Sequence, residues 1–214
     1  MSEMKYPRNA GTKCYAMIVD INGFAKMVKK DEFGGVADYT RDVLDGVIQR
    51  VERNHGEVVA FMGDALLSLF GVADDVFFAC HDIARNIDDQ CEYISGEQQG
   101  HPELWPFARG GPSIKILIEF GHVDVTVIES DFLGKQALLI GECINYASRI
   151  GAAGVGNRCL LGPAAAEQLA GYTIEGPWDV PGKGKEGKYK YYELPLGDEW
   201  REGDPDEMEE TYWG

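Results

Sequence analysis

The sequence predicts an α+β fold whose strands and helices follow the order β, α, β, β, α, β, the ferredoxin-like pattern, with further elements added. Three features support this prediction. Two strand-like runs flank a tight turn at Gly63 and Asp64, two stretches carry apolar residues at helical spacing, and later runs alternate apolar with polar residues. With 214 residues, of which 44% are hydrophobic, the chain is long enough for one well-cored domain.

The first half of the chain combines strand formers with two helical stripes. A short apolar run ends at the turn signalled by Asn22 and Gly23, and the first helical stripe closes at Gly56. The expected elements are a strand at 13–20, a helix at 36–54, hairpin strands at 57–62 and 65–70, and a second helix at 74–94 with Asp74 as its N-cap.

The second half begins with glycine, proline and polar residues that lack a period, which predicts a loop over 96–112. The expected elements after it are strands at 113–121 and 122–129, a helix at 142–153, a strand at 158–161, a small helix opening at Gly162 and Pro163, and strands near Tyr172 and at 189–194. We therefore expect an N-terminal extension over 1–12, one domain over 13–196 and an acidic tail over 197–214.

Composition argues against several classes of protein. Lys and Arg total 20 against 36 Asp and Glu, and the net charge of -16 opposes binding to nucleic acid. The five cysteines lack a Cys-x-x-Cys pair, so neither a disulfide framework nor a zinc knuckle is expected. No apolar run approaches the roughly 20 residues of a membrane helix, and no signal core begins the chain. We expect a cytoplasmic protein that binds neither membrane nor nucleic acid.

Two acidic residues stand at strand ends beside turns: Asp20 after the first strand and Asp64 at the hairpin tip. If the first strand pairs with the hairpin, as the predicted order allows, both carboxylates converge on one edge of the sheet. Carboxylates of this kind suit Mg²⁺ or Mn²⁺, which proteins hold with one or two carboxylates together with substrate phosphates. Taken singly, each aspartate is also a common turn residue, and that alternative stays open.

Polar groups that could handle a nucleotide occur in two later segments. Asn145 and Arg149 lie four residues apart in a predicted helix, so both project from one face. Asn can orient a sugar oxygen and Arg can hold a phosphoryl group, although a solvated helix face is the alternative. The glycine-rich segment 182–188 offers Lys183 and Lys185 to phosphates, or is a mobile surface hairpin, and it lacks the ending of a Walker loop.

Three motifs, in this order and spacing, resemble those of class III adenylyl and guanylyl cyclases. They are Ile18-Val-Asp-Ile-Asn-Gly-Phe24, Gly56-x6-Gly63-Asp64 followed by Ala-Leu-Leu-Ser-Leu-Phe, and Gly141-x2-Ile144-Asn145-x-Ala147-x-Arg149. The resemblance spans roughly residues 15–194. Each motif is weak alone, and the three together make coincidence improbable.

The resemblance implies a two-metal site that holds the triphosphate. Asp20 and Asp64 would bind two Mg²⁺ or Mn²⁺ ions, with the Ile21 carbonyl as a further ligand. The turn amides near Gly23 and Phe24 would hold phosphates.

The resemblance also implies catalytic residues supplied across a dimer interface. Asn145 would orient the ribose, Arg149 would stabilise the pentavalent phosphorus, and Lys183, or Lys185 in its place, would contact the triphosphate. Because this chain holds both halves of the site, the resemblance implies a homodimer with two active sites at the interface.

The chain departs from the family at the positions that read the base. Adenylyl cyclases carry Lys and Asp where this chain has Ala60 and Leu138, and the Glu and Cys common in guanylyl cyclases are absent too. An apolar pair leaves a purine edge without partners, at a loss of about 1–3 kcal/mol. In this the chain resembles the pyrimidine cyclases of bacterial antiphage Pycsar systems, which make cyclic UMP or cyclic CMP for a separate effector. UTP is the favoured substrate, mainly because uridylate cyclases are the commoner activity in that group.

Other functions remain as alternatives. A cytidylate cyclase ranks next, followed by an adenylate cyclase and by an inactive pseudo-cyclase that senses a nucleotide. The pseudo-cyclase is disfavoured because none of Asp20, Asp64, Asn145 and Arg149 is lost. A ferredoxin-like RNA-binding module is opposed by the charge of -16.

Overall fold

The computed structural model describes residues 12–30, 35–101, 111–131, 134–153, 156–181 and 188–197. The expected extension and tail therefore lie almost wholly outside the described residues. The strands are β1 (Thr12–Ile21), β2 (Glu57–Met62), β3 (Ala65–Phe70), β4 (Ile114–Ser130), β5 (Gly134–Ile140), β6 (Arg158–Leu161), β7 (Glu175–Asp179) and β8 (Lys190–Glu193). The helices are α1 (Phe24–Lys30), α2 (Val36–Arg53), α3 (Ala73–Gly100), α4 (Glu142–Ile150) and α5 (Pro163–Gln168), with a short 3₁₀ turn, η1 (Gly151–Ala153).

The predicted ferredoxin-like order is confirmed. The strands lie side by side in the order β2-β3-β1-β4-β6-β8-β7, and β5 pairs with β4 alone. The first four strands, with α2 after β1 and α3 after β3, form the βαββαβ core. The β4–β6 pair is parallel and the other pairs are antiparallel.

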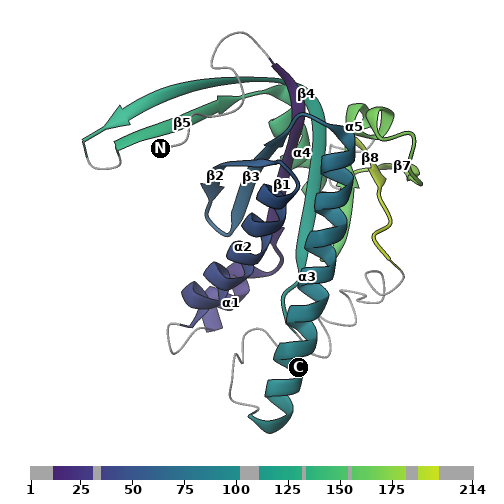
Figure 1. Ribbon diagram of the computed structural model, residues 1–214. Helices are drawn as coiled ribbons and strands as arrows, with labels where there is room; N and C mark the ends of the chain where they lie inside the picture. Colours follow the sequence, from purple (N-terminus) through teal and green to yellow (C-terminus); the bar gives the residue numbers. More distant parts are fainter. Residues whose placement is uncertain are drawn as a thin grey trace.

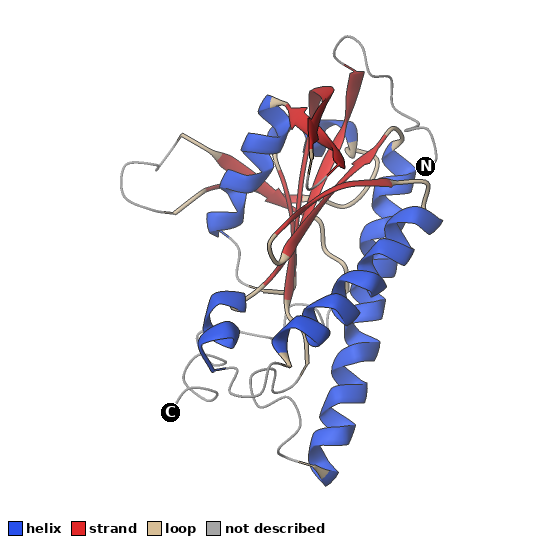
Figure 2. Ribbon diagram, turned by 90° about the vertical axis from the view of Figure 1, so that its left-hand side faces the viewer, coloured by secondary structure: helices blue, strands red, loops and turns tan. Residues whose placement is uncertain are grey.

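The sheet separates two core clusters. Met17 and Val19 of β1 belong to the first core cluster, which α2 and α3 cover, whereas Ala16 and Ile18 belong to the second core cluster, which α4 covers. This alternation follows from the pleat of a strand, whose successive side chains point to opposite faces. Figure 2 shows helices on both sides of the strands. By the same alternation, Asp20 lies on the face that carries α4.

The loop predicted over 96–112 is wrong in its first part, because helix α3 includes residues 96–100. The helix continues through Gly96 to Gly100, and residues 102–110 lie outside the described part. A Cβ at Gly96 would meet nothing within 4 Å, so this glycine serves no turn, and one exposed glycine weakens a helix by only about 1 kcal/mol. The predicted N-cap is also wrong: the helix is capped at Val72, and Asp74 instead accepts a hydrogen bond from the Tyr172 hydroxyl.

The prediction of two separate strands at 113–121 and 122–129 is wrong, because both ranges belong to β4. They form one strand of 17 residues, whose inner part pairs with β1 without a register shift and whose outer part pairs with β5. Gly121 is required for packing, because a Cβ there would lie 3.0 Å from the Cβ of Cys143 on α4. In Figure 1 the β4–β5 hairpin extends away from the sheet.

Two short elements were not predicted from the sequence: β5 and α1. Helix α1 has seven residues, of which Met27 is the one found in the buried core. Its sequence therefore shows no periodic row of apolar residues from which a helix could be predicted. The helix follows directly on the turn at Gly23, whose φ of 75° favours glycine. Among the described residues, no helix is both long and apolar enough to cross a membrane.

Candidate active site

The ends of β1 and β3 bring Asp20 and Asp64 together. Asp20 pairs in register with Ala65, the residue that follows Asp64, and the Ile21 amide donates a hydrogen bond to the Asp64 carbonyl oxygen over 3.4 Å. The backbone therefore places Asp20 and Asp64 beside each other at the same end of the neighbouring strands β1 and β3, and the charge of Asp20 acts on Asp64.

Lys115 lies beside this pair of aspartates. The Lys115 Nζ is 3.2 Å from Asp20 Oδ2, and the exposed fractions of the two side chains are only 15% and 30%. The contact follows from register, since Asp20 and Lys115 are direct partners across β1 and β4. Lys115 is thus paired with Asp20, and its charge also acts on Asp64.

The electrostatics of the pair favour an additional cation. Partial burial raises the pKa of Asp64 above its usual value, and the nearby Asp20 charge raises it further, while a backbone hydrogen bond and Lys115 act in the opposite direction. Among the described residues, no group of three or more His, Cys, Asp or Glu side chains gathers at one point. Two carboxylates with open coordination positions fit Mg²⁺ or Mn²⁺ shared with phosphates, rather than an all-protein cage.

Helix α4 presents Asn145 and Arg149 on its exposed face, while Cys143, Ala147 and Ile150 are buried against the sheet. The four-residue spacing places both polar side chains on one side of the helix. Within the described part of the chain, neither side chain has a hydrogen bond or an ion pair with Asp20 or Asp64. In the described part of the chain, the aspartates and the polar face of α4 are therefore not joined by a hydrogen bond or an ion pair.

Arg149 does contact the aromatic ring of Tyr189. The guanidinium carbon lies 5.5 Å from the ring centroid, and the Nζ of Lys188 lies 5.6 Å from the same centroid. The Tyr189 ring in turn packs edge-on against Tyr146 of α4, with centroids 5.3 Å apart. The end of the glycine- and lysine-rich segment is therefore anchored beside α4.

The two positions expected to face the base lie on different parts of the sheet. Ala60 is partly buried on β2 and packs against the second core cluster. Leu138 lies on β5 opposite Thr126, with 41% of its surface exposed. Leu138 is not a member of that cluster, whereas its neighbours Ala137 and Leu139 pack against it.

The remaining candidates are the phosphate contacts. Gly23 lies in the turn after β1 and Phe24 is the first residue of α1, and the Gly23 carbonyl accepts hydrogen bonds from the amides of Lys26 and Met27. Ile21 is the last residue of β1. Lys183 and Lys185 lie outside the described residues.

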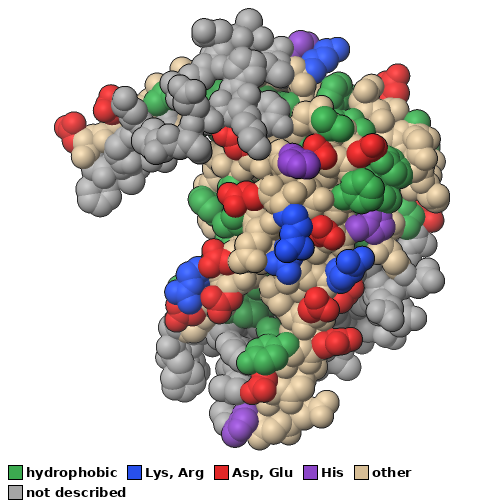
Figure 3. Space-filling view, viewed as in Figure 1, with side chains coloured by type: hydrophobic (Ala, Val, Ile, Leu, Met, Phe, Trp, Pro, Cys, Tyr) green, Lys and Arg blue, Asp and Glu red, His purple; other side chains and the backbone are tan. Residues whose placement is uncertain are grey.

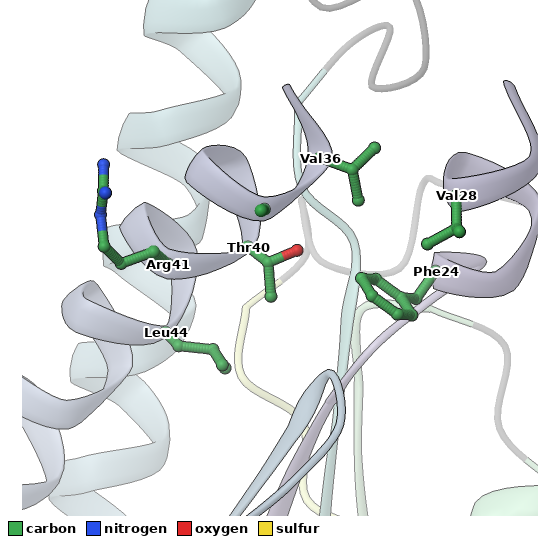
Figure 4. Close-up of a pocket in the computed structure, with 7 residues that line it drawn as sticks. Phe24, Val28, Val36, Thr40, Arg41 and Leu44 are labelled. Atoms are coloured by element: carbon green, nitrogen blue, oxygen red, sulfur yellow. The ribbon is translucent and has the colours of Figure 1, made fainter. Parts of the chain in front are cut away.

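An apolar pocket of about 490 Å³ opens beside α1. Figure 4 shows Phe24 and Val28 of α1 across from Val36, Thr40 and Leu44 of α2. The lining also includes Ala37 and Arg41, and neither Asp20 nor Asp64 is part of it.

Lys115 and Tyr189 were not identified as site residues from the sequence. Lys115 occupies a polar position of an alternating strand, and only the register with β1 reveals its partner. Tyr189 was assigned to a terminal strand, and its contact with Arg149 joins residues 40 positions apart.

No protein-family model and no curated protein matches this sequence. Several solved structures share its fold. The adenylyl cyclase CyaB from P. aeruginosa is 17% identical with a TM-score of 0.68, over 87% of this chain and 95% of that one. The guanylate cyclase domain of RhGC from Catenaria anguillulae, in complex with GTP, is 18% identical with a TM-score of 0.63, over 85% and 96%.

A further solved structure is a non-canonical dimeric guanylyl cyclase domain, from the RhoGC fusion protein of Blastocladiella emersonii. It is 18% identical with a TM-score of 0.61, over 87% of this chain and 98% of that one. At these identities, the similarity establishes the fold, which is that of class III cyclase catalytic domains.

Proposed function

We propose that this chain, with the fold of class III cyclase catalytic domains, is itself a nucleotide cyclase that converts a ribonucleoside triphosphate to its 3′,5′-cyclic monophosphate and pyrophosphate. The observation that carries the proposal is the meeting of Asp20 and Asp64 beside Lys115. The motifs that carry both aspartates and the Asn145/Arg149 helix are those of such cyclases. None of these four residues has been replaced, which supports an active enzyme over a pseudo-cyclase.

Asp20 and Asp64 would hold two Mg²⁺ or Mn²⁺ ions, with the Ile21 carbonyl as a further ligand. The raised pKa of Asp64 supports this assignment, because a cation relieves the repulsion between the two carboxylates. When bound, such ions lower the pKa of the attacking hydroxyl and neutralise the leaving group. Lys115, which is paired with Asp20, would bring a further positive charge near the phosphates.

The protein's own groups provide the rest of the chemistry. The ribose 3′ oxygen attacks the α-phosphorus, its proton leaves, and the bond to pyrophosphate breaks. Asn145 orients the ribose, and Arg149 donates N–H groups to the oxygens on which negative charge grows. The amides at Gly23 and Phe24, with Lys183 or Lys185, hold the triphosphate. Hydrogen-bond donors of this kind, which are in position before the reaction begins, each contribute a rate factor of about 10²–10³.

The active sites lie between two copies of the chain. Asn145 and Arg149 are exposed on α4 and make no contact with the aspartates of their own chain among the described residues. A symmetric pair in which each α4 faces the partner's aspartates completes two equivalent sites. The RhoGC domain of the same fold is a dimer.

The substrate is a pyrimidine nucleotide, with UTP preferred over CTP. Ala60 and Leu138 carry no polar side-chain atom, so neither donates to nor accepts from a purine edge. A buried purine amine without a partner loses about 1–3 kcal/mol of binding. The product, cyclic UMP, then activates a separate cyclic-nucleotide effector in antiphage defence.

The chain acts in the cytoplasm on a free nucleotide. All five cysteines are free thiols, as a reducing compartment favours. An RNA-binding role is disfavoured, because on the face in Figure 3 Lys and Arg side chains lie beside acidic ones and form no continuous basic surface.

The test is a pyrophosphate-release assay with Mn²⁺ and each of ATP, GTP, UTP and CTP, with the cyclic product identified by mass. We expect UTP to be turned over fastest and CTP next. Turnover of ATP ahead of both pyrimidines contradicts the base assignment and leaves the cyclase assignment intact. No turnover of any of the four contradicts the cyclase assignment, and nucleotide binding without turnover would support the pseudo-cyclase alternative.

A paired variant sharpens the base assignment. Ala60→Lys with Leu138→Asp restores the adenine-reading pair of adenylyl cyclases and should raise ATP turnover relative to UTP. The single variant Leu138→Asn serves as the matched control, since it adds polarity without the lysine.

A further inference from the structure

We propose that Tyr189 is a positioning residue, whose ring holds the Arg149 guanidinium in the orientation that the reaction uses, and that Tyr146 fixes Tyr189 in turn. This inference rests on the proposed function. It assigns a role to two aromatic residues that none of the motifs specifies.

The first observation is the contact between Arg149 and the ring. The Arg149 guanidinium carbon lies 5.5 Å from the Tyr189 ring centroid, within the range at which a cation is attracted to an aromatic face. An exposed arginine otherwise samples many rotamers. The ring restricts these rotamers through its face and leaves the N–H groups of the guanidinium available for a phosphate.

The second observation is that Tyr189 is itself held in place. The Tyr146 hydroxyl donates a hydrogen bond to the Lys190 carbonyl over 3.1 Å and accepts one from the Lys190 amide over 3.0 Å. The Tyr146 ring also packs at 70° against the Tyr189 ring. Tyr146 and Arg149 lie three residues apart on α4, so the helix that carries the arginine also anchors the residue that orients it.

The third observation is that the same ring gathers a second cation. The Nζ of Lys188 lies 5.6 Å from the Tyr189 centroid. Two cations repel each other, and the negative face of an aromatic ring between or beside them offsets part of that repulsion. The Tyr189 ring therefore keeps two cations, Arg149 and Lys188, near the place where the proposed reaction develops negative charge on phosphate oxygens.

The contact is made by the ring, so the ring and the hydroxyl of Tyr189 have different expected roles. Tyr189→Phe keeps the aromatic face and should retain the position of Arg149. Tyr189→Leu removes the face while keeping an apolar side chain. Tyr191→Leu is the matched control, because Tyr191 lies on β8, just beyond Tyr189, and contacts Trp178 instead of Arg149.

The experiment measures kcat and KM for the best nucleotide with Mn²⁺, together with melting temperatures. We expect Tyr189→Leu to lower kcat by about tenfold to a hundredfold with KM changed less than about twofold, as for a displaced catalytic group. Tyr189→Phe should restore most of this loss. Tyr191→Leu should lower the melting temperature by as much as Tyr189→Leu without the fall in kcat.

A double-mutant cycle separates positioning from general damage. With Arg149→Ala already present, Tyr189→Leu should lower kcat no further, because the ring acts through that arginine. A direct readout is the Arg149 Nε proton in NMR spectra, which the ring current shields in the wild type and in Tyr189→Phe and should release in Tyr189→Leu.

Two outcomes overturn the proposal while the wild type is active: Tyr189→Leu and Tyr191→Leu having equal kcat, or Tyr189→Leu remaining fully damaging in the Arg149→Ala background. A wild type that turns over none of the four nucleotides is a different failure, that of the proposed function. The shielding of the Arg149 proton then still reports whether the ring holds the guanidinium.

Discussion

At the scale of single residues, Asp64 shows a conflict between stability and function. Burial and the charge of Asp20 raise the pKa of Asp64, so its ionised form is less favourable in the folded chain than in the unfolded one. That same ionised form is the one able to bind a metal ion. If Asp64 binds a metal ion as proposed, the chain without metal gives up some stability to keep this carboxylate available.

Asp64→Asn should move stability and activity in opposite directions. A raised folded pKa means that stability falls as pH rises through that pKa, so at pH 7 without metal the neutral amide should melt at a higher temperature than the wild type. Cyclase turnover should fall by at least about a thousandfold, since a metal ligand is lost. Asp38→Asn, on the exposed face of α2, is the control. A lower melting temperature for Asp64→Asn at neutral pH would contradict this account.

At the scale of helices and strands, local patterns predicted most of the fold. The hairpin of β2 and β3 and the helices α2 and α4 follow directly from apolar periodicity and from the glycines around them. The boundary at Gly121 was wrong, because this glycine exists for close packing against Cys143 and not for a turn. Such a requirement becomes visible only when α4 is placed on the sheet.

The residues of the candidate site also divide into those that could be predicted from the sequence and those that could not. Asp20 and Asp64 could be brought together from strand order alone, because each stands at the end of a strand beside a turn. Lys115 could not be assigned, since its partner depends on the register between β1 and β4. Tyr189 depends on the packing of distant elements. The metal, phosphate and catalytic roles of the site residues stay predictions.

The junction of β4 with α5 makes a prediction of pH dependence. Glu119 is only 5% exposed, and its Oε1 accepts hydrogen bonds from the amides of Phe120 at 2.7 Å and Ala165 at 2.8 Å. Burial raises the pKa of Glu119 despite these bonds. The wild type should therefore lose stability as pH rises from about 4, the unfolded value, through the folded pKa.

Glu119→Gln removes this titration and keeps an oxygen for the amides. Its unfolding free energy relative to the wild type should increase between pH 4 and pH 8, measured by denaturant titration at several pH values. Glu97→Gln, at the exposed end of α3, should show a constant difference. A pH-independent difference for Glu119→Gln would mean that the buried carboxyl does not titrate on folding.

At the scale of the whole molecule, the two groups of residues proposed to form the active site lie on separate elements. The aspartates lie at the ends of β1 and β3, and the exposed side of α4 carries Asn145 and Arg149. The exposed apolar side chains near these groups include Phe61 on the β2–β3 hairpin and Ile140 on β5. A second copy of the chain would cover such surfaces and complete both sites together.

Mixing two inactive variants tests this arrangement. Asp20→Asn and Arg149→Ala should each be nearly inactive alone. If each site combines two chains, random exchange of subunits makes half of the dimers mixed, and each mixed dimer holds one intact site, giving about a quarter of wild-type activity. Activity that stays at the sum of the separate variants would place each site within one chain.

Strand β4 runs without a break from the central sheet into the projecting hairpin, so the two parts share one strand. At about 3.3 Å per residue, its 17 residues measure roughly 55 Å along the chain, with Lys115 near one end and the tip of the hairpin at the other. A single inserted residue just beyond Gly121 would leave Lys115 opposite Asp20 and turn every side chain of the outer half to the reverse face. Whether the number of residues in β4 is odd or even thus decides which face of the β4–β5 hairpin is turned toward its surroundings.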